Sequence, residues 1–496
     1  MKVQAITQAL RQQGILLSSE ADSLEIQSIG YDSRSASSGM LFLCKGAAFK
    51  PEYLLKAAEK GAVCYLADQH YPTDLPAILV SNLRRGLAVA SAAFYGNPAQ
   101  SLDLLGITGT KGKTTTAFLT RAILRASGET YGLLSSVLTD TGFEEREAHL
   151  TTPEAPDLQR MLAEIRDGGA KGAVLEVSSQ GLATERVWGV NFARAAFLNI
   201  GQDHISPIEH KDFADYFGAK KKICEHTPEV LVNLDAPFSD EFMEHARQCG
   251  CRVVTFGQDE RAEIRAINLS SSPAGSRFTV VCPEFEQTFE LPLLGAFNVS
   301  NALAAIGLCR GRVAPAQMAL ALKSASVPGR MVVLDGGDIT VIVDYAHNKM
   351  SFETLFGDLR REFPGRRLIS IFGCPGGKAF LRRKDLAEAA GQLTDHIVLT
   401  AEDPNFDDVD EINEQISSYI RPTGTSYESI PDRAEAVLHT ISTACPGDVI
   451  VITGKGEETY QKVAGEYLPF EGDILLSQRA LAQRNPSLCK NPSAEQ

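Results

Sequence analysis

Residues 106–116 form a glycine- and threonine-rich segment whose residue types suit the binding of a nucleoside triphosphate. The apolar run 102–105 before it suits a strand, and the apolar spacing of 117–124 after it suits a helix. A strand, a glycine-rich turn and a helix N-terminus direct backbone N–H groups and the helix dipole at a phosphate. Lys113 can then reach the β- and γ-phosphates, and the Thr114 hydroxyl can ligate Mg²⁺. A tight turn with a capping threonine is the alternative, which the whole segment disfavours. The residues expected to bind ATP here are Gly109, Thr110, Lys111, Gly112, Lys113, Thr114 and Thr115.

Other polar side chains follow apolar strands, where α/β sheets place their chemistry. Glu176 follows the run 173–175 and can hold the Mg²⁺ of bound ATP, although a helix-capping acid is the alternative. His204 is either a metal ligand or a structurally satisfied histidine. Asn298 and Asn301 share one face of the first turn of an alanine-rich helix. Capping is the alternative for either asparagine, but their paired spacing favours contact with the nucleotide.

The phosphate loop departs from a standard Walker A motif. Counted back from Gly112 and Lys113, that motif has its first glycine at position 107, whereas this chain has Ile107 and carries Gly106 instead. The pattern Gly-x-x-Gly-Thr-x-Gly-Lys-Thr resembles the loop of the Mur ligases, which form amide bonds with ATP in bacterial cell-wall assembly. Further motifs in family order, from about 30 to 475, resemble the MurE class. Differences in 205–210 identify the chain as a member of a divergent branch.

The resemblance implies a binding site for a UDP-linked acceptor. The Asp-Ser-Arg motif at 32–34 resembles the opening of the family's UDP-binding domain, although it is by itself only a turn. The segments 151–153 and 176–182 resemble those that contact the muramoyl peptide; a helix start is the alternative at Pro153. Gln180 replaces the usual histidine and is assigned no role. The implied acceptor-binding residues are Ser33, Thr151, Thr152, Ser178 and Arg186.

The resemblance also implies the metal ligands. The segment 212–220 resembles one whose lysine is carbamylated by CO₂ in most Mur ligases, and alignment selects Lys220. A protonated amine cannot ligate Mg²⁺, whereas a carbamate supplies the hard oxygens that this cation prefers. Because 220–222 are three lysines, a solvated helix face is the alternative. The expected metal ligands are Thr114, Glu176, His204 and Lys220, and the expected catalytic residues are Lys113, His204 and Lys220.

A third domain is implied to close over the nucleotide. The Gly-Arg pair at 329–330 resembles the family's hinge, whose arginine, here Arg330, reaches the nucleotide from across the cleft. Asp344 and His347 belong to an Asp-Tyr-Ala-His motif and would flank the nucleotide. A turn with a solvated side chain is the alternative for each.

The same domain selects the incoming amino acid in the MurE class. Arg383 in the loop 373–385 can hold a carboxylate through two hydrogen bonds, and Arg382 is the alternative. The segment 402–405 lacks the arginine that diaminopimelate-adding enzymes carry, and Glu457 stands where they usually have histidine. Acids here suit a cationic side chain, so an amine-bearing substrate such as L-lysine is favoured. The implied residues are Arg383, Asp403 and Glu458.

Alternating strand and helix patterns predict an α/β protein with three domains. They are an N-terminal UDP-substrate domain (1–99), a central P-loop ATPase domain with a mostly parallel sheet (100–328), and a Rossmann-like C-terminal ligase domain (329–485), followed by a polar tail (486–496). Among the expected elements are a helix over 4–13 and strands over 40–43, 62–66 and 369–373.

Composition limits the partners. A length of 496 residues suits two to four domains, and a net charge of −14 argues against a general binder of nucleic acid or anionic membranes. No stretch approaches ~18 uninterrupted apolar residues, and the N-terminus does not lead into a signal-peptide core. We therefore expect a cytoplasmic monomer whose partners are ATP, a UDP-muramoyl dipeptide and an amino acid, without nucleic acid or membrane.

The resemblance implies the reaction. ATP would phosphorylate the D-glutamate γ-carboxylate of UDP-MurNAc-L-Ala-D-Glu, and the amine of the amino acid would attack the acyl phosphate. Lys113, Mg²⁺ and Arg330 would neutralise the phosphate charge. One alternative is a related ligase acting on folate or a non-UDP peptide, against which the motif at 32–34 argues. Another is a nucleotide-binding regulatory protein without ligase chemistry, which the set Glu176, His204 and Lys220 disfavours.

Overall fold

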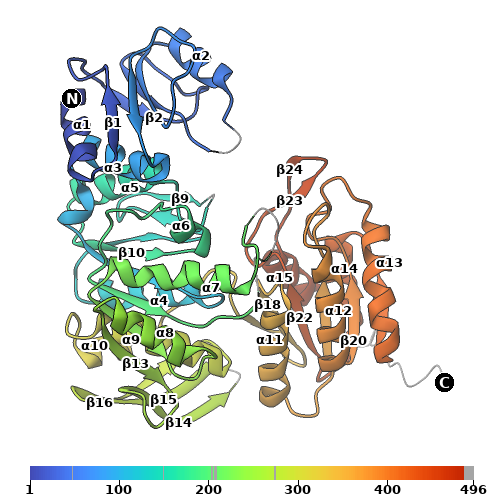
Figure 1. The fold of residues 1–496 in the computed structure, drawn as a ribbon. Helices are drawn as coiled ribbons and strands as arrows, with labels where there is room; N and C mark the ends of the chain where they lie inside the picture. The colour runs from blue at the N-terminus through green and yellow to red at the C-terminus, as the bar shows by residue number, and fades with distance from the viewer. Residues whose placement is uncertain (47–48, 149, 203–204, 206–208, 273–274, 485–496) are drawn as a thin grey trace.

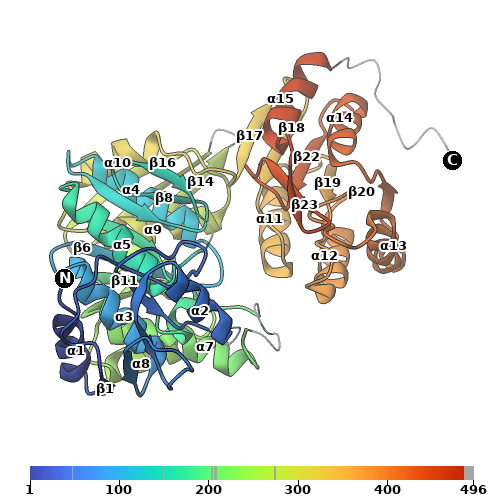
Figure 2. The same cartoon turned by 90° about the horizontal axis from the view of Figure 1, so that it is seen from above.

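The computed structural model describes residues 1–484 except 47–48, 149, 203–204, 206–208 and 273–274. Figure 1 shows an N-terminal domain above a central domain, with the C-terminal domain beside the central one. The view from above in Figure 2 places the C-terminal domain to one side of the other two. Nowhere in the described part of the chain is there a helix long and apolar enough to cross a membrane.

The described N-terminal domain contains a five-stranded sheet of order β1-β5-β4-β3-β2, antiparallel only between β1 and β5. Val3, Ile6 and Leu10 are buried on one face of the first helix and pack in a core with Leu41 and Leu66, as the helical spacing of these residues predicts. The elements are α1 (Val3–Gln12), β1 (Leu16–Ser19), β2 (Ser28–Gly30), β3 (Met40–Leu43), α2 (Pro51–Glu59), β4 (Ala62–Ala67), β5 (Ala77–Val80) and α3 (Leu83–Phe94).

The described central domain contains an eleven-stranded sheet of order β16-β15-β14-β13-β12-β11-β6-β10-β7-β8-β9. Its middle is parallel and both edges are antiparallel. Successive strand residues face opposite sides, so Leu105 and Ile107 of β6 join the core that includes residues of α4 and α9, while Leu104 joins the core that includes residues of α5 and α8. The strands are β6 (Asp103–Thr108), β7 (Tyr131–Leu134), β8 (Leu138–Asp140), β9 (Glu145–Glu147), β10 (Gly172–Glu176), β11 (Arg194–Phe197), β12 (Glu229–Asn233), β13 (Arg252–Gly257), β14 (Ile264–Ser272), β15 (Gly275–Cys282) and β16 (Phe285–Leu291). The helices are α4 (Lys113–Arg125), α5 (Ala155–Asp167), α6 (Ser179–Ala183), α7 (Phe213–Lys221), α8 (Ser239–Gln248), α9 (Ala296–Cys309) and α10 (Pro315–Lys323).

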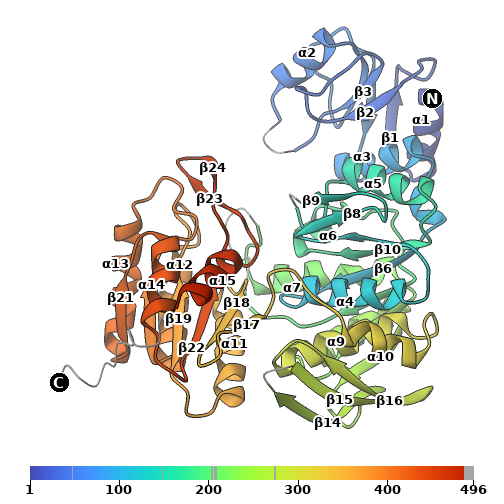
Figure 3. The same cartoon turned by 180° about the vertical axis from the view of Figure 1, so that it is seen from behind.

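The described C-terminal domain contains a six-stranded sheet of order β17-β18-β22-β19-β20-β21, parallel except for β17. Apolar residues of α11, α12 and α13 pack in one core and those of α14 and α15 in another. Figure 3 shows these helices around the sheet from behind. The elements are β17 (Val332–Asp335), β18 (Thr340–Asp344), α11 (Lys349–Glu362), β19 (Leu368–Phe372), α12 (Phe380–Leu393), β20 (His396–Leu399), α13 (Val409–Ile420), β21 (Ser426–Ser429), α14 (Arg433–Thr443), β22 (Val449–Thr453), the hairpin β23 (Tyr460–Val463) and β24 (Glu466–Pro469), and α15 (Asp473–Gln483).

The predicted fold class is confirmed: the protein is α/β, and its large sheets are mostly parallel. The predicted helix over 4–13 and the strands over 40–43, 62–66 and 369–373 occur within one or two residues of their expected bounds. The antiparallel edges of the central sheet were not expected.

Candidate active site

The glycine-rich segment joins β6 to α4, as its residue pattern predicts. Lys113 is the first helical residue, and its Nζ donates to the carbonyl oxygens of Gly109 at 2.9 Å and Thr110 at 3.2 Å. Gly112 precedes it with φ of +85°, and a Cβ there would lie 2.2 Å from Oδ1 of Asn301. Glycine is therefore required both by the backbone conformation and by the close approach of α9.

Neighbouring elements hold the loop in place. The backbone N–H of Lys111 donates to Asn199 Oδ1 at 2.9 Å, and Asn199 Nδ2 donates to the Lys111 carbonyl at 3.1 Å. The hydroxyls of Thr110 and Tyr216 are 3.0 Å apart, and Gly201 N–H donates to the Thr110 hydroxyl at 3.0 Å. Sequence reasoning assigned no role to Asn199 or Tyr216. The position of Asn199 at the end of a predicted strand is the signal that could have pointed to it.

The two asparagines of α9 are buried beside this loop. Asn298 Nδ2 donates to the Leu294 carbonyl at 2.7 Å, and Asn301 Nδ2 donates to Asn298 Oδ1 at 3.2 Å. Their shared helix face is confirmed. Their contact with the adenosine part of ATP stays a prediction.

A candidate Mg²⁺ site lies beside the start of α4. Glu176, at the end of β10, is 1% exposed, and its Oε1 accepts from Ser136 N–H at 3.1 Å. Burial raises the pKa of Glu176, which the positive charges of Lys113 and Arg330 oppose. Its Oε2 makes no hydrogen bond with any residue that the structure describes, while the Thr114 hydroxyl lies 3.0 Å from that of Ser136. A buried carboxylate oxygen with a hydroxyl nearby fits the oxygen ligands that Mg²⁺ prefers.

The structure describes only one of the two remaining predicted metal ligands. His204 lies outside the described residues. Lys220 is 1% exposed, so the solvated helix face proposed as an alternative for it is wrong. Its Nζ donates to the Gly109 carbonyl at 2.9 Å, whereas Lys221 pairs with Glu241 at 2.9 Å. The structure thus brings Lys220 to the phosphate loop, and its carbamylation stays a prediction.

The predicted acceptor residues of the central domain meet at the end of β10. Thr152 Oγ1 donates to the Glu176 carbonyl at 2.9 Å and accepts from Ser178 N–H at 2.9 Å. Arg186 donates to the Thr152 carbonyl at 2.9 Å and pairs with Glu154 at 2.9 Å. These contacts hold Thr152, Ser178 and Arg186 together, and their contact with the acceptor stays a prediction.

The N-terminal domain adjoins this group. Lys45 pairs with the same carboxylate of Glu154 at 3.1 Å, so both domains contact one acid. Ser33 is buried in the turn after β2, and Thr151 is half-buried beside the central-domain group. Their contact with the acceptor stays a prediction.

The hinge arginine packs on the Asp-Tyr-Ala-His motif. Arg330 lies over the ring of Tyr345, with 4.4 Å from its guanidinium carbon to the ring centroid, and its charge opposes the burial that raises the pKa of both Glu176 and Asp344. Asp344 is 8% exposed and accepts from the N–H groups of Met331 at 2.9 Å and Ala346 at 2.7 Å. The solvated turn proposed as an alternative for Asp344 is therefore wrong.

His347 and Asn348 complete this motif. His347 Nδ1 lies 2.7 Å from the Tyr345 carbonyl. Asn348 caps α11 through a reciprocal capping box with Ser351, so its side chain serves the helix start.

The predicted amino-acid residues surround a lysine that sequence reasoning missed. Lys455 is fully buried, and its Nζ lies 2.8 Å from Asp403 Oδ1 and 2.5 Å from Glu458 Oε2. Both acids expected to receive a cation are therefore paired within the protein. Glu402, in the acidic segment expected to suit a cationic side chain, is 8% exposed, and its Oε2 makes no hydrogen bond within the described residues. Burial and the charge of Asp403 raise the pKa of Glu402 to about 7, against the opposing charge of three neighbouring cations.

The two candidate arginines differ in their surroundings. Arg383 is buried and donates to Asp407 Oδ2 at 3.0 Å and to Gln415. Arg382 lies 3.7 Å from Glu402 Oε1. Arg383 therefore holds the loop to α13, while Arg382 faces the acidic group.

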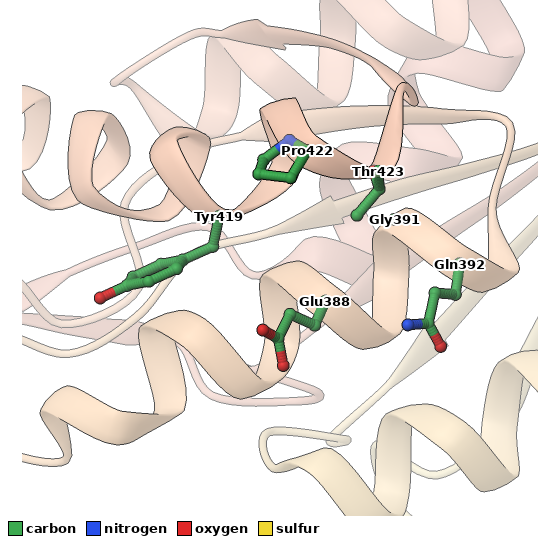
Figure 4. Close-up of a pocket in the computed structure, with 6 residues that line it drawn as sticks. All are labelled: Glu388, Gly391, Gln392, Tyr419, Pro422 and Thr423. Atoms are coloured by element: carbon green, nitrogen blue, oxygen red, sulfur yellow. The ribbon is translucent and has the colours of Figure 1, made fainter.

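A shallow pocket elsewhere on the C-terminal domain contains none of the predicted residues. Figure 4 shows Tyr419 and Glu388 along its wall, between α12 and the turn after α13. Its lining residues are Glu388, Gly391, Gln392, Tyr419, Pro422 and Thr423.

Comparisons with known proteins agree with this geometry. Residues 107–309 match the Mur ligase middle domain, and 329–456 match the Mur ligase glutamate ligase domain. The UDP-N-acetylmuramoyl-L-alanyl-D-glutamate–L-lysine ligase of Enterococcus faecalis is 36% identical over 95% of this chain and 94% of its own length. The corresponding 2,6-diaminopimelate ligase of Bacillus licheniformis is 35% identical over 92% and 95%.

Solved structures show the same fold. A UDP-N-acetylmuramoyl-L-alanyl-D-glutamate–2,6-diaminopimelate ligase superposes with a TM-score of 0.69 at 24% identity, covering 97% of this chain and 99% of its own. Mycobacterium tuberculosis folylpolyglutamate synthase gives 0.61 at 19% identity, covering 81% and 96%, which is a likeness of fold alone. The matched domains and the full-length relatives show that the chain belongs to the Mur ligase family.

Proposed function

We propose that this protein uses ATP to join a diamino acid, L-lysine in preference to diaminopimelate, to UDP-MurNAc-L-Ala-D-Glu in the synthesis of peptidoglycan precursors. Relatives named for this acceptor align with 95% and 92% of the chain, shares too large to leave out the N-terminal domain. The folate enzyme resembles it in fold alone, over a smaller share of the chain. An acceptor linked to UDP is therefore favoured over folate.

The observation that carries the proposal is a buried carboxylate beside the phosphate loop: Glu176 accepts from the N–H of Ser136 at 3.1 Å, and the Ser136 hydroxyl lies 3.0 Å from that of Thr114. The charges of Lys113 and Arg330 both oppose the burial that raises the pKa of Glu176. Lys113 and Arg330 would neutralise the charge that develops on the transferred phosphoryl group. Mg²⁺, held by Thr114, Glu176, His204 and carbamylated Lys220, would supply further charge neutralisation. Thr152, Ser178 and Arg186 would hold the acceptor with its γ-carboxylate toward this place.

The charges around Lys455 support the preference for lysine. Glu402, Asp403 and Glu458 are balanced by Lys455 and, more weakly, by Arg382 at 3.7 Å from Glu402. The three acids therefore exceed the two cations by one negative charge. A side-chain ammonium would bind the Glu402 oxygen that has no partner among the described residues. Diaminopimelate brings a second carboxylate, which this excess negative charge repels.

We also expect the enzyme to work in the cytoplasm, where its two nucleotide substrates are made, and as a monomer, because one chain supplies every group named above.

Product formation tests the proposal. Purified protein is incubated with ATP, Mg²⁺, UDP-MurNAc-L-Ala-D-Glu and either L-lysine, meso-diaminopimelate or L-ornithine, and products are identified by mass. We expect ADP and the lysine-containing UDP-tripeptide in equal amounts, and no ADP without the UDP-dipeptide. A tripeptide formed only with diaminopimelate would overturn the lysine preference, and ATP hydrolysis that never depends on the UDP-dipeptide would overturn the ligase assignment.

A further inference from the structure

Tyr345 contacts two charged groups, an acid expected to bind the amino acid and the arginine expected to bind the nucleotide. Its hydroxyl donates to Glu458 Oε1 at 2.8 Å, and the other oxygen of that carboxylate pairs with Lys455. The face of the same ring carries the guanidinium of Arg330 at 4.4 Å. One side chain thus touches both an acid of the amino-acid pocket and the cation that reaches the nucleotide side.

The backbone around this side chain leaves little room for independent movement. A Cβ on Gly456 would lie 3.1 Å from the Tyr345 ring and 3.0 Å from the Gly329 carbonyl, and one on Gly329 would lie 2.7 Å from the backbone nitrogen of Glu457. Both glycines have positive φ, +58° and +60°. The hinge and the loop that carries Lys455 therefore pack directly on each other, with the Tyr345 ring against them.

We propose that Tyr345 is a positioning residue that couples occupancy of the amino-acid pocket to the placement of Arg330 at the nucleotide. The identities of the two ligands rest on the proposed function. A cation bound at Glu402 places positive charge near Lys455, the partner of Glu458, and so changes the charge around the acceptor of the Tyr345 hydroxyl. Because the hydroxyl fixes the ring and the ring face holds Arg330 through a cation–π contact, such a change is transmitted to the hinge.

Two substitutions separate the two contacts. Tyr345→Phe keeps the ring face for Arg330 and removes the hydroxyl, whereas Tyr345→Leu removes both. We expect Tyr345→Phe to raise KM for the amino acid about 10-fold, as a lost hydrogen bond to a charged acceptor implies. Because coupling between two binding sites is reciprocal, KM for ATP at saturating amino acid should rise several-fold as well. Tyr345→Leu should in addition lower kcat. Tyr419→Phe, the same change on the same domain but in the pocket of Figure 4, is the matched control and should leave every constant unaltered.

Ligand binding without turnover provides a second readout. The affinity for the amino acid is measured with and without a non-hydrolysable ATP analogue and UDP-dipeptide. In the wild type the nucleotide should strengthen amino-acid binding several-fold, and in Tyr345→Phe this factor should fall toward one. Thermal unfolding of each variant shows whether the fold is retained.

An amino-acid KM in Tyr345→Phe equal to that of the wild type would overturn the proposal, as would an unchanged coupling factor. A double variant with Glu458→Gln gives a further check, since the two changes should not be additive if the hydroxyl acts through that carboxylate. If the wild type itself makes no UDP-tripeptide, the proposed function fails instead, so the two failures are distinguishable.

Discussion

Replacing Lys113 by alanine should separate catalysis from folding. The structure bounds the effect on stability. The Nζ makes two hydrogen bonds to loop carbonyls, at 2.9 and 3.2 Å, each worth about 0.5–1.5 kcal/mol net. The cation also lies at the positive end of α4, which costs about 0.3–1 kcal/mol. The free energy of unfolding should therefore fall by no more than about 2.5 kcal/mol, or a decrease in Tm of less than about 10 °C.

The expected effect on the reaction is larger. A preorganised cation beside developing phosphate charge is worth at least the roughly 10²–10³-fold in kcat that a single donor contributes in a water-excluded site. Tripeptide formation by Lys113→Ala should thus fall by that factor or more while the protein stays folded. Product is measured by mass, and unfolding is followed by heat and by denaturant.

Lys323→Ala serves as the matched control. Lys323 is exposed and pairs with Glu290 at 2.8 Å at the end of α10, and such surface pairs contribute about 0–1 kcal/mol. Its loss should change neither turnover nor Tm appreciably. Turnover by Lys113→Ala within a few-fold of the wild type would refute the assignment of the phosphate loop.

Three further outcomes are expected. The affinity for L-lysine should rise as pH increases from about 6 to about 8, because the pKa of Glu402 is about 7 and its ionised form binds the ammonium. Glu402→Gln should remove this dependence and lower kcat/KM for lysine about 30-fold or more. A pH profile unchanged by that substitution would contradict the assignment. Lys220→Ala should lose at least about 100-fold in kcat, and added acetate should restore part of it if a carbamate oxygen binds Mg²⁺; no rescue over a wide acetate range would argue against the carbamate. Arg433→Met should lower the free energy of unfolding by about 3–5 kcal/mol, since it leaves Asp473 buried without its partner at 2.7 Å; the double variant with Asp473→Leu should recover part of this loss in thermal unfolding.

The groups that sequence alone identified share a local origin. Lys113 and Glu176 each stand at a fixed offset from an apolar strand, and β6 and β10 are adjacent and parallel, so their carboxyl ends meet. The topology of the sheet therefore places Lys113 and Glu176 at the same edge, although more than sixty residues separate them in the sequence. The asparagine pair of α9 was found for the same reason, because helical spacing fixes the shared face.

The groups that were missed depend on long-range packing. A buried lysine such as Lys455 looks in sequence like any surface lysine, and only the folded chain shows Asp403, from more than fifty residues earlier, beside its Nζ. The environment of Glu402 likewise follows from desolvation, which a single sequence does not reveal. The antiparallel edges of the central sheet escaped notice because strand patterns do not state their direction of pairing.

The protein's own side chains hold the phosphate loop in place. The Asn301 side chain occupies the space above Gly112, and the Tyr216 hydroxyl contacts that of Thr110. The Asn199 side chain makes hydrogen bonds with both the N–H and the carbonyl of Lys111. Little conformational entropy then remains to be lost when a triphosphate enters, so no other substrate is needed to order the loop. Bound triphosphate would add negative charge that attracts Arg330. We therefore expect the triphosphate to bind before the other substrates.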